Sequence, residues 1–304
     1  MQLNTLKLAR YRFIFRVTEP IFLPDYAGST LRGVFGRALR RISCMTKQDD
    51  CKACSLYITC PYTNIFETPP KKHQIQKFSQ VPNGYIIEPP QWGRKTYQIG
   101  EELSFELVLF GKLIEQLPLI AFAFQRAFQY SVAKGKGELV DIQHQLNNQF
   151  DSIYYDKKLL DHKTVIQMIG QLSDSIQLMI TTPLRLQSDG KPLNEKSITI
   201  ERFLIGLAKR ISLLSEFHAQ PLELDFVRLQ QELTAIDDHK QLKWLDWKRY
   251  SSRQNQKMAL GGVVGKWTLH NVSEDWLKLL YWGQWLHCGK NATFGLGKYE
   301  MTNL

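Results

Sequence analysis

Alternation of apolar and basic residues near the start of the chain is the feature that most restricts its fold. Between Ala9 and Val17 every second residue is apolar, and Arg10, Arg12 and Arg16 occupy positions between them. A period of two, with one apolar and one basic face, is typical of a β-strand that is buried on one side. The sequence therefore predicts a half-buried strand here.

The same order of elements occurs twice along the chain. After the first strand we expect a helix at about 29–42, strands at 85–88 and 102–110, a helix at 112–132 and a strand at 138–144. In the second half we expect strands at 176–186, 244–250, 263–270 and 293–301, with helices at 198–217 and 275–285. The order strand, helix, strand, strand, helix, strand is that of a ferredoxin-like unit.

We therefore expect an α+β protein of two tandem ferredoxin-like (βαββαβ, RRM-like) domains. The first is predicted to span residues 1–150, with a cysteine-bearing insertion at about 43–82. The second is predicted to span residues 173–304, and the polar segment 149–173 would contain the join.

Composition narrows the class of protein and of partner. The 304 residues are 43% hydrophobic and 22% charged, which is globular composition and excludes wholesale disorder. No apolar run approaches the roughly 18–20 residues that cross a bilayer, and the first residues lack the layout of a secretory signal. We therefore expect a cytoplasmic location and no membrane partner. The formal net charge of +10 favours a polyanionic partner, of which nucleic acid is the commonest.

The strongest local signal is the segment Leu286–Tyr299, which contains a glycine-rich loop at 288–299. Its three glycines permit positive φ and close approach by a phosphate chain, and its two lysines add charge. Phe294 and Tyr299 would stack on unpaired bases. The segment lacks the GxxxxGK[ST] spacing, so it is not a nucleotide-binding P-loop. The alternative interpretation is a tight connection into an edge strand.

A second cluster, residues 243–257, holds five cations against one acid, interleaved with Trp244, Trp247 and Tyr250. Cations that alternate with aromatic rings suit RNA, because charge holds the phosphates while splayed bases stack. The alternative is a solvated basic edge strand that resists aggregation.

Arginines also gather in the N-terminal domain. The three on the first strand, and those of the predicted helix at 32, 37, 40 and 41, would together line a groove between the domains. Ordinary solvated charge is the alternative.

Four of the five cysteines lie close together in the chain. Their spacing is Cys44-x6-Cys51-x2-Cys54-x5-Cys60. A central CxxC is half of a tetrahedral zinc site, and four thiolates complete one. The sequence therefore predicts a structural zinc ion, with an iron–sulfur cluster or free thiols as alternatives. Cys288 stands apart and is expected to be a small packed residue.

Several motifs together resemble a known family. They are His287–Tyr299, Thr182–Leu186, Arg249–Gln254, Gly261–Gly265, Gly28–Gly33 and Cys60–Tyr62. With the two-domain plan, they are similar to the CRISPR repeat-processing endoribonucleases of the RAMP superfamily. The resemblance implies that the chain binds a precursor CRISPR RNA at its repeat and cuts once per repeat to leave mature crRNA. It also implies association with subunits of a CRISPR effector complex.

The chemistry that the resemblance implies needs no metal cofactor. A 2′-hydroxyl attacks the adjacent phosphate and leaves a 2′,3′-cyclic phosphate and a 5′-hydroxyl. A base, an acid and cations are required, and histidine suits the first two because its pKa lies near neutrality. Members of the family often carry a histidine on or just after the first helix, but residues 29–42 contain none. We therefore expect His287, next to the loop, or His73, after the helix, to be catalytic.

The residues expected to bind RNA come from the three basic segments. They are Arg32, Arg37 and Arg40 on the helix, Lys248, Arg249 and Arg253 in the second cluster, and Gly289, Lys290, Asn291, Thr293, Phe294, Gly295, Gly297 and Lys298 in the loop.

Two other functions fit the same sequence. The first is a RAMP subunit that holds crRNA without cutting it, which the absence of a histidine from the first helix favours. The second is a zinc-stabilised subunit whose basic surface docks other proteins. In that case RNA binding would be weak, salt-labile and indifferent to repeat sequence.

Overall fold

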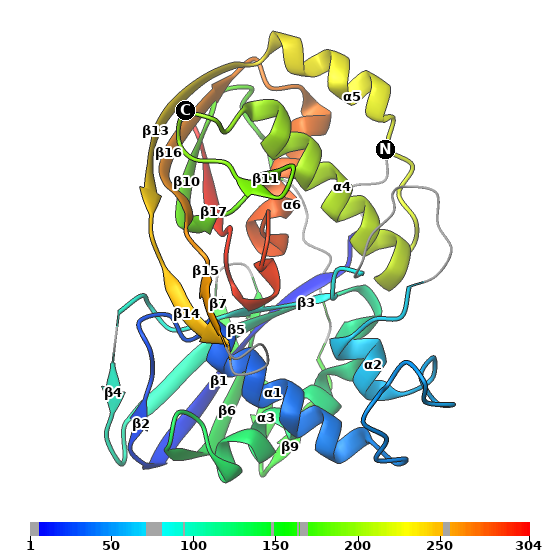
Figure 1. Ribbon diagram of the computed structural model, residues 1–304, viewed down its shortest axis with the longest axis vertical. Coiled ribbons are helices and arrows are strands. Elements are labelled where there is room, and N and C mark those ends of the chain that lie inside the picture. Colours follow the sequence, from blue (N-terminus) through cyan, green and yellow to red (C-terminus); the bar gives the residue numbers. More distant parts are fainter. Residues whose placement is uncertain are drawn as a thin grey trace. The chain divides into compact units, whose positions relative to one another are not determined.

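The structure is a computed structural model, and it describes residues 6–70, 81–93, 95–146, 149–162, 164, 170–251 and 256–304. The chain divides into two compact units, and we describe each by itself (Figure 1). The N-terminal unit comprises Leu6–Gln167 and Glu216–Gln220, and the C-terminal unit is built mainly from Met168–Ser215 and Pro221–Leu304. The division at residue 167 lies within the segment 149–173.

The N-terminal unit contains one antiparallel sheet with the strand order β3-β5-β1-β6-β7. Its strands are β1 (Leu8–Glu19), β3 (Tyr85–Glu88), β5 (Glu102–Phe110), β6 (Lys136–Leu146) and β7 (Gln149–Ser152). In chain order the first four strands of this sheet are arranged 2-3-1-4, so the first strand lies between the third and the fourth. That arrangement is the ferredoxin-like one, extended by β7 at one edge.

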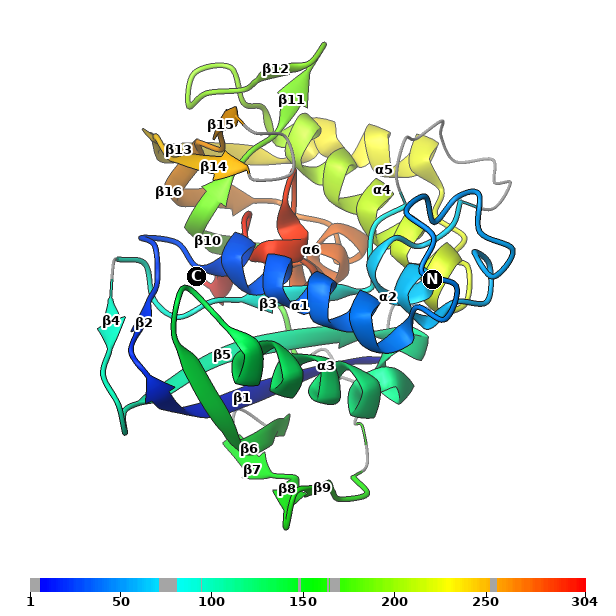
Figure 2. The ribbon, with the colours of Figure 1, turned by 60° about the horizontal axis from the view of Figure 1, so that its bottom comes forward.

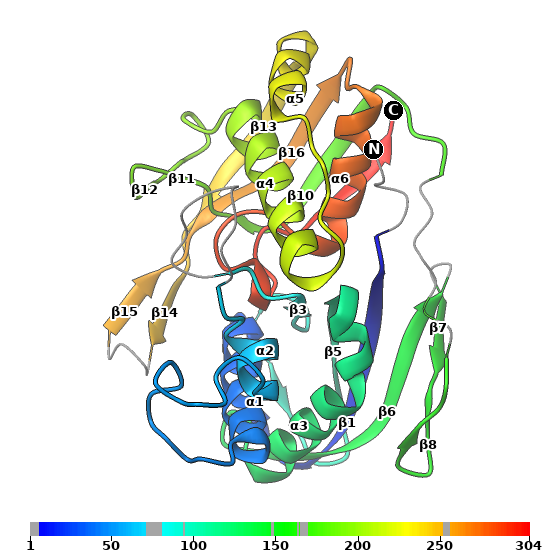
Figure 3. The same cartoon turned by 90° about the vertical axis from the view of Figure 1, so that its right-hand side faces the viewer.

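Helices α1 (Gly28–Ser43) and α3 (Leu117–Tyr130) pack together over one face of this sheet (Figure 3). The expected helix at 112–132 is divided, because residues Gly111–Gln116 form the 3-10 turn η2. Proline is best tolerated in the first turn of an α-helix, and Pro118 accordingly lies in the first turn of α3. Smaller elements are α2 (Pro61–Phe66) and the two-stranded ribbons β2 (Ile21–Phe22) with β4 (Thr96–Tyr97) and β8 (Tyr154–Tyr155) with β9 (Lys158–Leu159).

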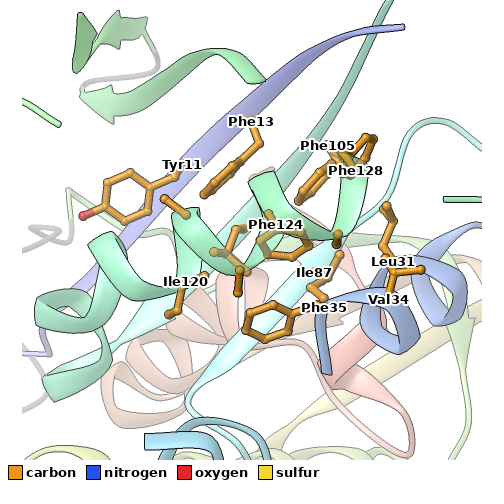
Figure 4. Close-up of a cluster of buried hydrophobic side chains, with 14 of the residues drawn as sticks. Tyr11, Phe13, Leu31, Val34, Phe35, Ile87, Phe105, Ile120, Phe124 and Phe128 are labelled. Carbon is orange, nitrogen blue, oxygen red and sulfur yellow. The ribbon is translucent and has the colours of Figure 1, made fainter. Parts of the chain in front are cut away.

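The core of the N-terminal unit is built on aromatic rings (Figure 4). The ring of Phe124 on α3 lies 4.6 Å from Phe35 on α1, 4.8 Å from Phe105 on β5 and 5.4 Å from Phe13 on β1, between centroids. All four side chains are buried. Phe124 therefore joins both helices to the sheet.

The basic face of β1 is compensated by carboxylates. Arg10 pairs with Glu88 at 2.9 Å, Arg12 with Glu106 at 2.7 Å and Arg16 with Glu102 at 3.3 Å, each measured from guanidinium nitrogen to carboxylate oxygen. The antiparallel register explains two of these pairs, since Arg12 lies opposite Glu106 and Arg16 opposite Glu102. These ion pairs reduce the charge that the β1 arginines offer to a phosphate, and their place in a groove between the domains stays a prediction.

The C-terminal unit repeats the arrangement with different residues. Its antiparallel sheet has the order β13-β16-β10-β17, which is again 2-3-1-4 in chain order. The strands are β10 (Ile176–Leu184), β13 (Asp237–Leu245), β16 (Gly262–His270) and β17 (Tyr299–Asn303), and the principal helices are α4 (Ile200–His218) and α6 (Glu274–Leu286). The two tandem ferredoxin-like units predicted from the sequence are therefore present.

Smaller elements complete the second unit. They are α5 (Phe226–Glu232), η3 (Leu233–Ala235), η4 (Ala292–Phe294), and the two-stranded ribbons β11 (Gln187–Ser188) with β12 (Lys191–Pro192) and β14 (Lys248–Ser251) with β15 (Gln256–Ala259). In the part of the chain that the structure describes, no helix has the length and apolarity that a membrane span requires.

Two strands differ from the expected ranges. The strand expected at 293–301 begins only at Tyr299, because residues Ala292–Phe294 form η4. The expected strand at 244–250 belongs to two elements: β13 ends at Leu245, and β14 begins at Lys248 and pairs with β15. β13 is an edge strand whose first seven residues are mainly polar, so apolar alternation does not reveal it. Its register is held instead by pairing with β16 and by Trp267, whose indole N–H donates to Asp238 at 2.8 Å.

We predict that Phe124→Ala lowers the free energy of unfolding by about 3–5 kcal/mol, because it leaves a cavity where α1, α3 and the sheet meet. Phe122→Ala, two residues away on α3 at a 44% exposed position, is the matched control and should change it by less than about 0.5 kcal/mol. Urea unfolding measures both. Equal losses would contradict the assigned core.

His144 on β6 gives the N-terminal unit a pH dependence. Its ring centroid lies 5.2 Å from that of Tyr11 and 5.1 Å from that of His162, and Asp151 is its register partner on β7. Burial, assisted by the nearby charge of His162 and opposed by Asp151, lowers the pKa of His144 from its ordinary value of 6.5 to about 4. Protonation is therefore easier in the unfolded chain than in the folded one.

We predict that the stabilisation of the folded state by neutral His144 is complete above about pH 6.5. As the pH falls towards 4, the free energy of unfolding decreases by up to ~1.4 kcal/mol per pH unit. Urea unfolding at pH 7.5 and pH 5.0 measures the difference. His144→Gln should reduce it, and His239→Gln, at an exposed position on β13, should leave it unchanged. A wild-type stability that is flat over this range would contradict the assignment.

Candidate nucleic-acid interface

The segment between α6 and β17 forms a tight turn at 287–298, which we call the terminal turn. Positive φ angles occur at His287, Gly289, Asn291, Gly295 and Gly297. A Cβ atom on Gly297 would collide with the carbonyl oxygen of Cys288, and one on Gly289 would lie 2.7 Å from the carbonyl oxygen of Arg185. Only glycine combines positive φ with such close approach, so these two positions require it.

A second segment, Thr182–Arg185, fastens the terminal turn in place. The N–H of Gly297 donates to the carbonyl of Pro183 at 3.1 Å, and the N–H of Lys290 donates to that of Arg185 at 2.9 Å. The hydroxyl of Thr182 donates to the carbonyl of Gly295 at 2.8 Å and accepts from the N–H of Lys298 at 2.9 Å. Two motifs more than one hundred residues apart therefore form one substructure.

These internal bonds limit which parts of the terminal turn can meet a phosphate. Several N–H groups that the sequence offered for anion binding donate within the protein, among them those of Lys290, Gly297 and Lys298. The side chain of Lys290 is exposed, and its neighbours Gly289 and Asn291 are partly exposed. The tip at 289–291 is therefore the most exposed part of the turn.

Two aromatic rings of the predicted RNA site are buried. Phe294 is 7% exposed and Tyr299 is 1% exposed, with the Tyr299 hydroxyl donating to the carbonyl of Leu280 at 2.6 Å. The prediction that they stack on unpaired bases is corrected, because neither ring is open to solvent. The remaining turn residues vary: Thr293 and Lys298 are partly exposed, and Gly295 and Gly297 are buried.

His287 is fully buried at the end of α6. Its Nδ1 lies 3.3 Å from the carbonyl oxygen of Leu296, and the Nε of Arg210 donates to the carbonyls of Leu286 and His287 at 2.9 and 3.1 Å. Burial of the ring is an observation against direct proton transfer to RNA. The catalytic role of His287 stays a prediction, and His73 lies outside the described residues.

The second basic cluster is divided between the end of β13 and the antiparallel pair β14 and β15. Lys248 and Arg249 lie on β14, which pairs with β15 from Lys248↔Ala259 to Ser251↔Gln256. Arg253 lies outside the described residues. RNA binding by this cluster stays a prediction.

The predicted RNA-binding arginines on α1 have different surroundings. The guanidinium of Arg32 lies 4.2 Å from the ring centroid of Phe66, and Arg40 donates to the carbonyls of Gln48 and Asp49 at 2.6 and 2.9 Å. These two arginines fasten α1 to α2 and to the cysteine-bearing insertion. Arg37 instead lines an open groove between α1 and α3.

Sequence reasoning did not single out three other residues of that groove, namely Arg126, Tyr130 and Lys134. The available signal was the spacing of four residues between Arg126 and Tyr130, which places both on one face of α3. The apolar signal of the same helix concealed it.

The four clustered cysteines line one small pocket of about 60 Å³. Burial raises the pKa of the Cys51 thiol, with Arg40 opposing and Cys44 and Cys60 among the groups that add to it. Among the described residues, however, no group of three or more His, Cys, Asp or Glu side chains is arranged to hold a metal ion. The four thiols that line this pocket are donors that zinc prefers, but they are not gathered closely enough to hold the ion. The zinc ion therefore stays a prediction. Cys288 is buried, as a packed residue would be.

Comparison with known families gives two matches. Residues 6–165, which are more than half of the chain, match a family model named AF_1859_N and described as an N-terminal domain. Residues 178–299 match the family model of the CRISPR-associated endoribonuclease Cas6. The second match contains the Thr182–Arg185 segment and the whole terminal turn. A comparison with curated proteins found no match.

Solved structures show the same fold at low sequence identity. A partial Cas6-RT-Cas1–Cas2 complex aligns at a TM-score of 0.59 and 13% identity over 99% of this chain and 46% of that one. A second Cas6-RT-Cas1–Cas2 complex aligns with the same score and identity, and this chain spans 29% of it. The chain thus spans less than half of these relatives.

Relatives of similar length are Cas6 proteins. A Cas6 product complex aligns at a TM-score of 0.59 and 10% identity, over 97% of this chain and 99% of that one. Cas6 from Thermus thermophilus aligns at 0.52 and 11%, over 98% and 99%. The chain belongs to the AF_1859_N family, whose model matches more than half of it, and its residues 178–299 match the model of the Cas6 endoribonucleases, whose solved structures share its fold.

Proposed function

We propose that this protein binds a precursor CRISPR RNA and cuts it once per repeat to give mature crRNA. The observation that carries the proposal is the match to the Cas6 model over residues 178–299, which covers β13, β16, most of β10 and the whole terminal turn. The exposed tip of that turn, with Lys290 beside Gly289, supports it because such a tip can meet a phosphate chain closely. The match to the Cas6 endoribonuclease model supports nuclease activity, and the activity, the substrate and the mechanism belong to this proposal.

The proposed mechanism is cleavage by the RNA itself, without a metal cofactor. The 2′-hydroxyl oxygen bonds to the adjacent phosphorus, the bond from phosphorus to the 5′-oxygen breaks, and the products carry a 2′,3′-cyclic phosphate and a 5′-hydroxyl. A base takes the proton of the 2′-hydroxyl, an acid gives one to the leaving oxygen, and cations stabilise the phosphorane. Lys290 is a candidate for the last role.

Partners and location follow from the proposed substrate. A protein that makes crRNA would deliver it to subunits of a CRISPR effector complex in the cytoplasm. The partial Cas6-RT-Cas1–Cas2 complex is an assembly in which a relative of this fold is joined to other CRISPR proteins. For this chain, such association is part of the proposal.

A second function is favoured by one observation. Because the ring of His287 is fully buried, the terminal turn has no histidine open to RNA among the residues that the structure describes. A RAMP subunit that holds crRNA without cutting it would need none. It would bind the repeat tightly and yield no cyclic phosphate at any excess of protein.

We predict that the wild-type protein cleaves labelled repeat RNA in EDTA, and that replacing the 2′-hydroxyl before the cut with hydrogen abolishes cleavage, because the nucleophile is gone. His73→Ala and His287→Ala are compared in single-turnover reactions, with the exposed His239→Ala as control. Loss of rate in His73→Ala alone, with binding retained, would assign the base or acid outside the terminal turn. Cleavage that requires added magnesium would contradict the mechanism.

We also propose that Cys44, Cys51, Cys54 and Cys60 hold one structural zinc ion, and we predict about one equivalent per chain by elemental analysis after purification without chelator. Cys51→Ser together with Cys54→Ser should remove the metal and lower the thermal stability of the N-terminal unit, because ordering of the insertion depends on it. Less than about half an equivalent in the wild-type protein, with reactive free thiols, would contradict the zinc site.

A further inference from the structure

An open groove of about 1060 Å³ lies between α1 and α3 of the N-terminal unit. Figure 2 shows these two helices side by side. Arg37 and Arg41 line the groove from α1, Arg126 and Tyr130 from α3, and Lys134 from the turn after α3. We call it the α1–α3 groove.

The charge of this groove is positive and uncompensated. Its lining includes four cationic side chains and no carboxylate. Within the described ranges, none of these four cations forms an ion pair, whereas each of the arginines on β1 does. Four uncompensated cations around one open volume attract a polyanion, since no internal carboxylate has to be displaced first.

An aromatic ring accompanies the cations. Tyr130, at the end of α3, is 68% exposed, and the guanidinium of Arg41 lies 4.7 Å from its ring centroid. The ring is thus held beside a cation at the open face of the groove. An exposed aromatic ring beside an arginine is a stacking surface for an unpaired base.

The turn after α3 fixes the fourth cation. Ala133 and Lys134 both have positive φ, at 46° and 75°, and Val132 and Gly135 exchange backbone hydrogen bonds of 2.8 and 3.0 Å. Positive φ at two adjacent residues is the geometry of a tight two-residue turn and is unfavourable for residues other than glycine, asparagine or aspartate. The turn therefore holds the backbone of Lys134 at the rim of the groove.

We propose that the α1–α3 groove binds a single-stranded segment of RNA, with phosphates on Arg37, Arg41, Arg126 and Lys134 and a base stacked near Tyr130. This inference deepens the proposed function, because it assigns part of the same RNA substrate to a second surface. Cations combined with an exposed ring favour single-stranded nucleic acid over an acidic protein, which would use the charges but would not require a stacking surface.

The test is binding of an unstructured 20-nucleotide RNA, measured by fluorescence anisotropy at several salt concentrations. Arg41→Ala with Arg126→Ala should weaken binding and make the slope of log affinity against log salt shallower by about 1.4, since each lost phosphate contact contributes about 0.7 on single strands. Arg41→Lys with Arg126→Lys should preserve the slope. Arg202→Ala, at an exposed position of α4, is the control for a lost charge.

Stacking is tested separately. Tyr130→Ala should weaken binding about 5- to 100-fold with an unchanged salt slope, because base stacking is lost and no charge is. Tyr155→Ala, at a 75% exposed position in β8, is the matched control and should bind like the wild type. All these positions are on the surface, and an unchanged thermal unfolding midpoint confirms that each variant folds.

Wild-type affinity and slope in the double arginine variant, or wild-type affinity in Tyr130→Ala, would overturn the inference. Binding of an acidic peptide that competes fully with RNA in the wild type and persists in Tyr130→Ala would also overturn it. This test is separate from the test of the proposed function. Loss of RNA binding in the groove variants supports the inference even if the wild-type protein does not cut the repeat. Repeat cleavage by groove variants that bind RNA as tightly as the wild type supports only the proposed function.

Discussion

Pairing of arginine with glutamate determines which of the many cations of this chain are available to a polyanion. On β1 each arginine meets a carboxylate from β3 or β5, so the most regular basic pattern of the sequence serves the sheet. Arg32 and Arg40 likewise contact Phe66 and the insertion. On the groove side of α1 no such partner exists among the described residues. In a chain whose formal net charge is +10, four cations of the N-terminal unit therefore lie together without a compensating carboxylate in the groove lining.

Apolar periodicity was sufficient to predict both ferredoxin-like units, because each central strand and each core helix has a strongly patterned buried face. The method missed β13, since an edge strand with the sequence Asp-Asp-His-Lys-Gln-Leu-Lys carries little apolar signal. It also could not show that Arg12 meets Glu106, because residues 94 positions apart become neighbours only through strand register. Without the strand register, the sequence could not show which arginines are paired with carboxylates.

The candidate site was predicted unevenly for a similar reason. Glycine identity alone indicated positive φ at 289, 295 and 297, and the backbone has it at all three. Burial was not visible in the sequence: His287, Phe294 and Tyr299 face the protein because Thr182–Arg185 draws the terminal turn onto the sheet. Because several N–H groups of the turn donate to this segment, the turn has a fixed shape, and its tip is the part most exposed to a ligand. Recognition of RNA by this unit would thus rest on a few backbone positions and Lys290.

The most direct test asks which cations contact the RNA. The wild-type protein is photo-crosslinked to a repeat RNA that carries 4-thiouridine, and the attached peptides are identified by mass spectrometry. The account predicts crosslinks to peptides from the C-terminal half of α3, around Tyr130, and from the tip of the terminal turn around Lys290. Crosslinks confined to peptides of β1 and β5, whose arginines and glutamates are paired, would contradict it.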